Sequence, residues 1–287
     1  MTREAAATKR FRFSWYRDDF ESKIGVRGAR FTHVNNFLWA IVGLVVTVLF
    51  YAALSPWPNN LYVQVFTNRG PVQYIEVYFS FWALILVWVK WSKVRVQAKA
   101  IEFRDLVPAE ADFVLSPATV GQVLGRLREE CDDPDRFLLF NRISLALANL
   151  KNMGQIGDVD NVLQSQASND EDIMESGYTL VKGLIWAIPV LGFIGTVQGL
   201  GMAIGSFSGV LATTTEISKL KPALQGVTLG LATAFDTTFV ALVAALAIQL
   251  LLIFVRKREE EMMDECKNFC QRHIVGRLRL TPFERMG

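Results

Sequence analysis

The chain has 287 residues, of which 51% are hydrophobic and 20% are charged, and its formal net charge is only +2. This balance excludes a strongly basic nucleic-acid-binding protein and an acidic disordered chain, so no nucleic-acid partner is expected. The apolar residues are concentrated in four long stretches that are almost free of charge, which is typical of a protein that crosses a membrane several times.

The first apolar stretch extends from Val34 to about Leu54 and contains no charged residue. About 20 residues, each rising 1.5 Å, allow a helix to cross the roughly 30 Å hydrocarbon core of a bilayer. The preceding residues 1–33 are too many for the basic leader of a cleaved signal peptide, so this helix is predicted to remain in the mature protein. The basic, aromatic part from Phe11 to Arg17 is either a lipid-binding surface or a disordered tail.

The second apolar stretch runs from about Tyr74 to Val89. Its tyrosines and tryptophans suit the membrane–water interfaces, and Glu76 is placed near its outer end. Two prolines and two asparagines within residues 55–60 predict a turn before it, because these residues end helices and begin loops. Residues 34–91 are therefore predicted to form a first transmembrane hairpin.

Residues 92–177 form a polar middle segment with helical periodicity over 120–130 and 137–147. The stretch 164–172 is rich in Ser, Asn and Asp, and it is predicted to be a polar loop that caps a helix starting near Asp170. This helix is expected to continue unbroken into the third apolar stretch. The prolines that punctuate the segment are Pro108, Pro117 and Pro134.

The third apolar stretch, 183–215, carries no charge, and the fourth, 222–255, has Asp236 as its only ionisable residue. Each would form a helix of about 50 Å, which is longer than the hydrocarbon core, so both are predicted to tilt or to extend into water or protein. The short link 216–221 makes them a second hairpin. A helix is predicted for the polar segment 256–287 that follows. Its run of glutamates, 259–261, either pairs with arginines of a neighbouring subunit or forms a solvated face.

Lys and Arg residues are distributed unevenly, with 27 in the two terminal segments and residues 90–182 and three in the remaining loops. The positive-inside rule then places both termini and the middle segment in the cytoplasm. The predicted fold is an all-α membrane protein with four transmembrane helices, two of them long and extending into the cytoplasm, and a helical cytoplasmic domain. Its predicted divisions are 1–33, 34–91, 92–177, 178–255 and 256–287.

The three cysteines, Cys131, Cys266 and Cys270, fall in segments predicted to be cytoplasmic, where thiols stay reduced, so no structural disulfide is expected. Cys266, Cys270 and His273 repeat at helical spacing, which raises the alternative of a metal site. Only three ligands are visible, so an apolar stripe that packs against neighbouring subunits is the preferred interpretation. No metal and no other cofactor is predicted.

Small residues repeat every three or four positions along the third and fourth apolar stretches, which places them on one side of each helix. Such stripes allow two helices to approach closely, and they equally suit a narrow ion-conducting lining. Their Thr hydroxyls commonly bond a carbonyl of their own helix, as packing alone would also require. The stripe residues are Pro189, Gly192, Gly195, Thr196, Gly199 and Ala203 in the third stretch and Gly226, Gly230, Thr233, Thr237, Ala241 and Ala245 in the fourth.

Asp236 lies near the middle of the fourth stretch, where an acid costs about 2.5 to 3.5 kcal/mol to insert. Such residues generally face the interior of a helix bundle or a water-filled path. Two interpretations follow: Asp236 holds helices together through a hydrogen bond, or it belongs to an ion path.

Two short strings in these stretches are recognisable in combination. The third stretch has proline at 189, glycine at 192, 195 and 199, and the pair Thr196-Val197, while the fourth has Leu231-Ala-Thr-Ala and a long apolar tail. Over about residues 178–260 the chain resembles the MotA/TolQ/ExbB proton-channel family.

This resemblance implies the ion-conducting subunit of a motor in the bacterial inner membrane. Family members form pentamers around a dimer of single-span partners similar to MotB, TolR or ExbD, whose intramembrane aspartate carries the ion. The two pore threonines of the family fall on Thr196 and Thr233. The transported ion is H⁺ or Na⁺, with protons preferred. One charge crossing 100 mV releases about 2.3 kcal/mol, so no nucleotide is required, and the chain is not predicted to be an enzyme.

The chain departs from the family pattern in two respects. ExbB-like members carry a glutamate about five residues before the second threonine, where this chain has Thr228, and Asp236 with Thr237 and Thr238 are additions. The four-span layout resembles MotA, whereas the pore threonines resemble ExbB and TolQ, so the process that the motor drives stays open. The predicted ion pathway is Thr196, Thr233, Thr237 and Asp236.

Two other classes of function compete with this prediction. A secondary transporter normally has inverted repeats and discontinuous helices of comparable size, whereas the two hairpins here differ in length and composition. A non-conducting membrane scaffold would use the small residues for packing and Asp236 for a hydrogen bond alone. The preferred prediction is an ion-conducting motor subunit that forms a homo-oligomer, with a pentamer implied by the resemblance.

Overall fold

The computed structural model of the chain describes residues 11–25, 30–67, 70–103, 115–116, 119–148, 156–213 and 217–279. These residues are mostly helical, and the β-pairing among them consists of two isolated bridges, Phe13 with Cys131 and Leu115 with Leu278. The chain divides into two compact units. We call them the apolar unit, formed by 36–88 and 179–253, and the polar unit, formed by 1–35, 89–178 and 254–287.

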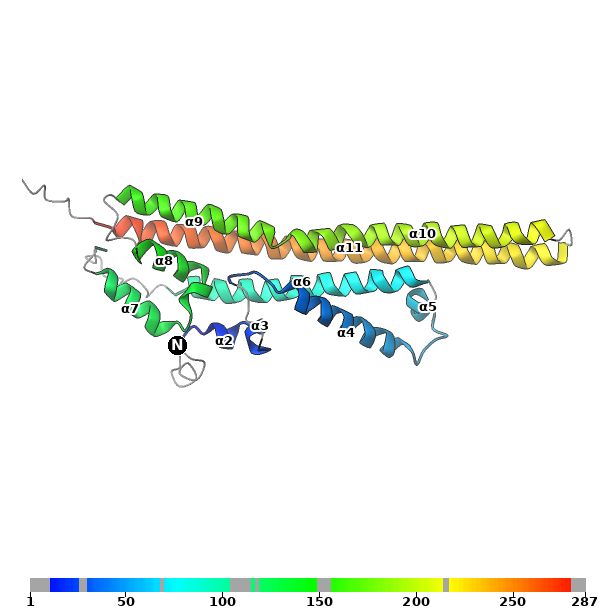
Figure 1. Cartoon of the computed structure of the whole chain (residues 1–287), viewed down its shortest axis with the longest axis horizontal. Coiled ribbons are helices and arrows are strands. Elements are labelled where there is room, and N and C mark those ends of the chain that lie inside the picture. The colour runs from blue at the N-terminus through cyan, green and yellow to red at the C-terminus, as the bar shows by residue number, and fades with distance from the viewer. Residues whose placement is uncertain are drawn as a thin grey trace, which may run out of the picture. The chain divides into compact units, whose positions relative to one another are not determined.

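The apolar unit contains the long apolar helices (Figure 1). Its elements are α4 (Asn36–Leu54), α5 (Leu61–Thr67), the first part of α6 (Pro71–Ile101), α10 (Thr179–Thr213) and the first part of α11 (Ile217–His273). Four of these helices, all except α5, are long and apolar enough to cross a membrane. This confirms the predicted all-helical class with four apolar helices. The short α5 was not predicted, because the sequence indicated only a turn in this loop.

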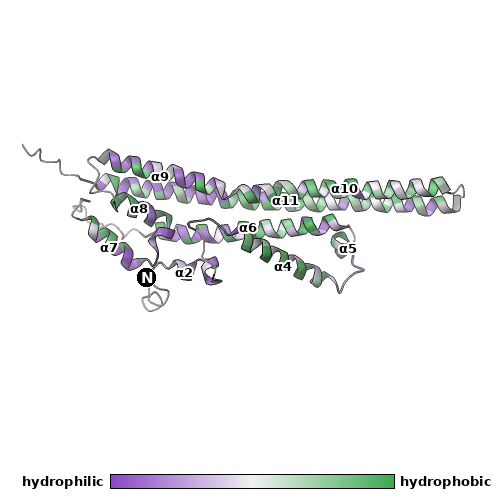
Figure 2. Ribbon diagram, viewed as in Figure 1, coloured by the Kyte–Doolittle hydropathy of each residue, from purple (hydrophilic) through white to green (hydrophobic). Residues whose placement is uncertain are grey.

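Close packing joins α4 to α6 within the apolar unit. A Cβ built on Gly43 of α4 would lie 3.1 Å from the Cα of Trp82 on α6, so glycine lets the two backbones approach. Aromatic rings fill the space further along, where the ring of Phe50 lies 5.4 Å from that of Phe66 and 5.3 Å from that of Phe81, measured between centroids. Figure 2 shows the hydrophobic colouring that predominates along α4.

The polar unit is built from shorter helices and from the ends of two long ones. Its elements are α2 (Trp15–Asp18), α3 (Phe20–Lys23), the end of α6, α7 (Val120–Glu130), η2 (Pro134–Arg136), α8 (Leu138–Ala148), α9 (Ile156–Ser176), the end of α11 and η4 (Val275–Arg277). The helices α7 and α8 occur where the periodicity predicted them. Val120, Val123 and Leu127 are all buried, so α7 covers the core with one face. Pro108 and Pro117 lie outside the described residues.

Two expectations for the segment before α10 are wrong. The stretch 164–172 is not a loop but lies inside α9, because Leu163, Ala167 and Met174 recur at helical spacing and are buried despite the polar residues between them. The helix does not continue unbroken, since a turn at Gly177 and Tyr178 separates α9 from α10. A Cβ at Gly177 would lie 3.2 Å from the Nζ of Lys90, so the turn is tightly enclosed.

The N-terminal aromatic segment is neither a lipid-binding surface nor a tail, because it is part of the core of the polar unit. Trp15 is 0% exposed, and its ring lies 5.4 Å from that of Phe137. Asp132 fixes the segment by accepting hydrogen bonds from the Ser14 hydroxyl at 2.6 Å and the Trp15 amide at 2.9 Å. Sequence pattern alone missed this because the partners are more than 100 residues away.

Candidate functional site

Glycines bring α10 and α11 into close contact (Figure 1). A Cβ built on Gly192 would lie only 2.5 Å from the Cβ of Ala241, and one on Gly230 only 2.6 Å from the Cβ of Ala203. Neither position can take a larger side chain unless the helices move apart. The contact is looser at Gly199, where a Cβ would lie 3.4 Å from the Cβ of Ala234.

Thr196 and Thr238 meet across this contact. Their hydroxyls are hydrogen-bonded to each other, from α10 to α11. The Thr196 hydroxyl also lies 3.0 Å from the carbonyl oxygen of Ala234 and 3.2 Å from that of Gly192. The Thr238 hydroxyl lies 3.0 Å from the same Gly192 oxygen. Both side chains are half-buried, so the pair is held inside the hairpin without being sealed.

The two hydroxyls can share their protons in two equivalent ways, because each can donate and accept. In one arrangement Thr196 donates to Thr238, which donates to the Gly192 carbonyl. In the other, Thr238 donates to Thr196, which donates to the Ala234 carbonyl. Switching between them reverses the bond between the two hydroxyls and replaces the bond to the Gly192 carbonyl with one to the Ala234 carbonyl. The heavy atoms stay in place, which is what a short proton relay or a polar ion-binding position needs.

The other predicted pathway residues lie around this pair. Thr237 is 1% exposed, and its hydroxyl donates to the Ala234 carbonyl at 2.8 Å. Its side chain fills the space beside Gly195, where an added Cβ would lie 3.1 Å from the Thr237 Oγ1. Asp236 is half-buried on the same helix. The side chain of Thr233 lies outside the described residues.

The remaining predicted packing residues differ among themselves. Pro189 lies within the continuous helix α10, next to Ile188, which is 0% exposed. Gly226 on α11 has no described atom within 4 Å of a Cβ built on it, so it makes no close contact within this chain. Ala245 is buried at 6% exposure.

Glu259 is the centre of a separate cluster in the polar unit. This side chain on α11 is 1% exposed and accepts hydrogen bonds from the hydroxyls of Thr32 and Tyr178. The Lys90 ammonium lies 3.4 Å from its Oε2 and 4.1 Å from the centre of the Tyr178 ring. The sequence suggested that this glutamate either pairs with a neighbouring subunit or faces water, and both interpretations are wrong because its partners belong to the same chain.

Lys90 begins a buried polar stripe on α6, continued by Lys93 and Gln97. The Lys93 ammonium lies 2.6 Å from a carboxylate oxygen of Glu21, in α3, and 3.6 Å from one of Asp19, the N-cap of α3. The Gln97 amide donates to the carbonyl of residue 136 at 2.7 Å and accepts from the amide of residue 138 at 2.9 Å. One helix face thus fixes three other parts of the polar unit.

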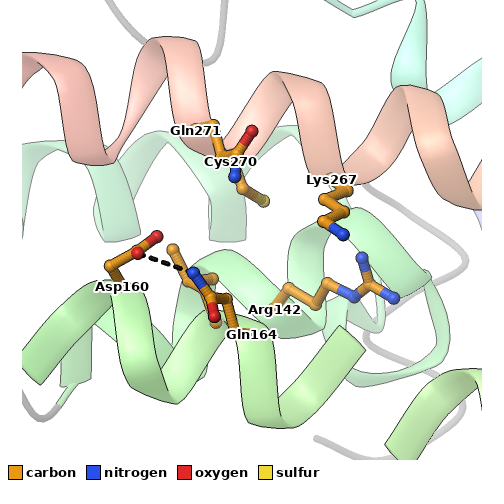
Figure 3. A pocket seen from close by; sticks show the side chains of 7 residues that line it. Arg142, Asp160, Gln164, Lys267, Cys270 and Gln271 are labelled. Atoms are coloured by element: carbon orange, nitrogen blue, oxygen red, sulfur yellow. Dashed lines mark hydrogen bonds between the residues drawn. The ribbon is translucent and has the colours of Figure 1, made fainter. Parts of the chain in front are cut away.

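A third polar contact joins α8 to α9, where the Arg142 guanidinium lies 2.6 Å from a carboxylate oxygen of Asp170. Figure 3 shows Arg142 at the edge of a small hollow, with Cys270 and Lys267 contributed by α11. Cys266 and Cys270 are buried within this chain, which replaces the expected stripe facing a neighbouring subunit. Among the residues that the structure describes, no group of three or more His, Cys, Asp or Glu side chains is placed to bind a metal.

Two residues of these sites were missed in the sequence. Thr238 was noted only as part of an added Thr pair, because the stripe of small residues passes through Thr237. Glu259 stands in a run of three glutamates that resembles an exposed face, and Glu260 and Glu261 do pair with exposed arginines. Apart from the residue types, nothing in the sequence indicated that Thr238 bonds Thr196 or that Glu259 is buried.

The MotA/TolQ/ExbB proton channel family matches residues 133–268. This match confirms the resemblance found in the motifs for this part of the chain. The match extends about 45 residues further toward the N-terminus than the motifs do, so it includes α8, α9 and the Arg142–Asp170 pair. No curated protein and no solved structure matches the chain.

Proposed function

We propose that the chain is the ion-conducting subunit of a bacterial inner-membrane motor. In this proposal it couples an ion-motive force to mechanical work through a single-span partner similar to MotB, TolR or ExbD. The single observation that carries the proposal is the reversible hydroxyl pair of Thr196 and Thr238, placed between two apolar helices of a segment that matches a proton channel family.

The proposed division of labour follows from the chemistry of the side chains. Threonine hydroxyls cannot carry a net charge, so the charge-carrying group is the partner's carboxylate. The hydroxyls of Thr196, Thr238 and, on family resemblance, Thr233 would donate hydrogen bonds to that carboxylate or offer oxygen ligands to its ion. Thr237 keeps α10 and α11 in register, and Asp236 attracts cations toward the path. The ion is H⁺ in preference to Na⁺.

The assembly is a proposal of the same kind. The positive-inside rule supports a cytoplasmic position for the polar unit and for both termini. Large apolar side chains are exposed along the membrane helices of the single chain, among them Phe193 at 64% and Phe239 at 68%, which is consistent with lipid and with neighbouring subunits of a pentamer.

Packing alone is the competing interpretation of the threonines, because the Thr196 hydroxyl bonds Gly192, Ala234 and Thr238, which all lie inside the hairpin. Ion flux separates the two. The complex with its partner is reconstituted in liposomes, and flux at a fixed potential is compared for wild type, Thr196→Val and Thr238→Val. We expect flux to fall by about 10- to 100-fold in both variants, if each loses about 1.5 to 3 kcal/mol of a bond to a charged group.

The matched control is Thr47→Val. Thr47 is a buried membrane-helix threonine whose hydroxyl bonds only the Gly43 carbonyl of its own helix α4, at 2.8 Å. This variant should conduct like wild type. Equal flux in all four proteins, with the complexes intact, would assign the hydroxyls to packing. Thr233→Val and Asp236→Asn, measured in the same way, then decide whether those residues belong to the path.

A further inference from the structure

A second group of buried polar side chains lies in the apolar unit, on α4 and α6, where the proposed pathway does not use it. Glu76 and Gln73 are both 0% exposed. Among the described residues, neither carboxyl oxygen of Glu76 has a hydrogen-bond partner, and neither does either polar atom of the Gln73 amide. The buried hydroxyl of Tyr51 on α4 is unpartnered in the same way.

These three side chains lie near one another. Gln73 and Glu76 are three residues apart, which places them on the same face of α6. The ring of Tyr51 lies 4.6 Å from that of Tyr74, between centroids, and Tyr74 is two residues before Glu76 on α6, so Tyr51 lies beside this part of α6. Ser80 does not serve the carboxyl, because its hydroxyl donates to the backbone carbonyl of Glu76 at 2.8 Å.

The group points into the protein and not toward lipid. Val77, Ala83 and Leu86 continue the same buried side of α6, each at most 5% exposed. Tyr51 of α4 and Tyr74 of α6 lie together at this part of the two helices, and the Tyr74 hydroxyl donates to the carbonyl of Thr67 at 3.3 Å. Neither tyrosine supplies a positive charge.

A carboxylate cannot remain ionised in such a place without a counter-charge, because burying an isolated charge costs far more than burying the neutral acid. The dipole of α6 gives little help, since its effect is confined to the first turn, and Glu76 is the sixth residue of a helix that starts at Pro71. The site therefore needs either a proton on the carboxyl or a bound cation. The oxygen atoms available as ligands are those of a carboxyl, an amide and a phenol, and this set suits a small hard cation.

We propose that Glu76, Gln73 and Tyr51 form a second cation site in the membrane region, which holds a proton or Na⁺ on oxygen atoms. A proton bonds to one carboxylate oxygen of Glu76, and the resulting O–H donates to the Gln73 amide oxygen. Na⁺ is held by the same oxygens. The site is separate from the threonine pair and does not depend on the proposed motor function.

Carbodiimide labelling tests the proposal on the full-length protein in membranes, with modification of Glu76 measured by peptide mass spectrometry. The reagent reacts with protonated carboxyls in apolar surroundings. We expect Glu76 to be labelled in Na⁺-free buffer, with a rate that falls as the pH rises. Glu76→Gln should lose this label, whereas Asp236→Asn, the matched change at the other membrane acid, should keep it.

Added Na⁺ distinguishes the two cations. If Na⁺ slows labelling at constant pH, and Gln73→Leu removes this protection, the site binds Na⁺ in competition with protons. If Na⁺ has no effect, the site takes protons alone, and Gln73→Leu should shift the pH dependence of labelling. Either result supports the site, and neither requires flux or a partner, so the outcome is independent of the test of the proposed function.

Infrared spectroscopy provides a readout that does not depend on reagent access. A protonated Glu76 gives a carboxyl carbonyl band in Na⁺-free buffer that Glu76→Gln removes. Absence of both the label and this band would overturn the proposal. Labelling that appears only in Arg69→Gln would also overturn it, because Glu76 would then be paired with Arg69, which lies outside the described residues.

Discussion

The contact between α10 and α11 and the polar unit bury polar groups in opposite ways. Between α10 and α11 the buried groups are neutral hydroxyls and backbone carbonyls, and the Thr196–Thr238 pair can reverse its bonds without moving an atom heavier than hydrogen. In the polar unit the buried groups are full charges, such as Glu259 with Lys90 and Arg142 with Asp170. Such ion pairs have one favourable arrangement.

This difference indicates separate roles. A reversible network tolerates the passage of a proton or an ion, whereas a buried ion pair fixes the distance between two segments and loses its compensation when either partner is removed. The hydroxyl pair therefore suits transfer, and the ion pairs suit a rigid connection between segments. Four experiments test this difference between the two kinds of buried contact.

The largest effect is expected at Glu259. Glu259→Ala leaves the Lys90 ammonium buried without its counter-charge, so the free energy of unfolding should fall by about 3 to 5 kcal/mol. The measurement is denaturant unfolding of the detergent-solubilised protein. Glu261→Ala is the control in the same run of glutamates. Its pair with Arg258 is exposed, so it should cost at most about 1 kcal/mol.

A double replacement tests whether the charge itself is responsible. Glu259→Leu combined with Lys90→Met removes both charges and should recover most of the lost stability, because no unpaired charge remains. Equal losses in Glu259→Ala and Glu261→Ala would show that the Glu259 cluster is not a structural centre.

An intermediate effect is expected at Gly192. Gly192→Ala places a methyl group 2.5 Å from that of Ala241, so we expect a loss of about 1 to 3 kcal/mol from forced separation of the helices. Gly226→Ala has open space around its Cβ and should be neutral or slightly stabilising. Unfolding in mixed micelles measures both.

Compensation identifies the cause of the Gly192 effect. Ala241→Gly, added to Gly192→Ala, moves the methyl group to the other helix and should restore much of the stability. If the double variant is as unstable as the single one, the loss arises within α10 and the close contact with α11 is not its source.

A smaller effect is expected for the hydroxyl pair. Thr196→Val and Thr238→Val should each reduce stability by about 1 kcal/mol, since each removes one side of a shared hydrogen bond. The two changes together should cost less than the sum, because the second removes a group whose partner is already gone. Strict additivity in a double-mutant cycle would indicate that the hydroxyls do not interact.

The smallest effect is expected at Arg256. Its guanidinium lies 3.2 Å from Glu175 and 2.9 Å from Glu260, and its side chain is 40% exposed. Arg256→Gln should cost less than about 1 kcal/mol at low ionic strength and nothing measurable at high salt, because solvent ions screen exposed charges. A loss that persists in high salt would place this arginine with the buried pairs.

The amino-acid sequence by itself determined the helical class, the four apolar helices and the family. Each depends on information that is local in the chain: the hydrophobicity of about 20 consecutive residues, or short strings such as Gly195-Thr196-Val197. Such features do not depend on the contacts that these residues make with distant parts of the chain. For the same reason the helices α7 and α8 were found from their periodicity alone.

Tertiary structure alone decided which polar residues meet. Glu259 contacts residues 32, 90 and 178, and Thr196 bonds Thr238 and not only the carbonyls of its own helix. These choices depend on the rotation and depth of each helix against its neighbours, and a shift of one residue turns a helical side chain by about 100°. No local pattern encodes that rotation, so the run of glutamates was misread as exposed and Thr237 was preferred to Thr238.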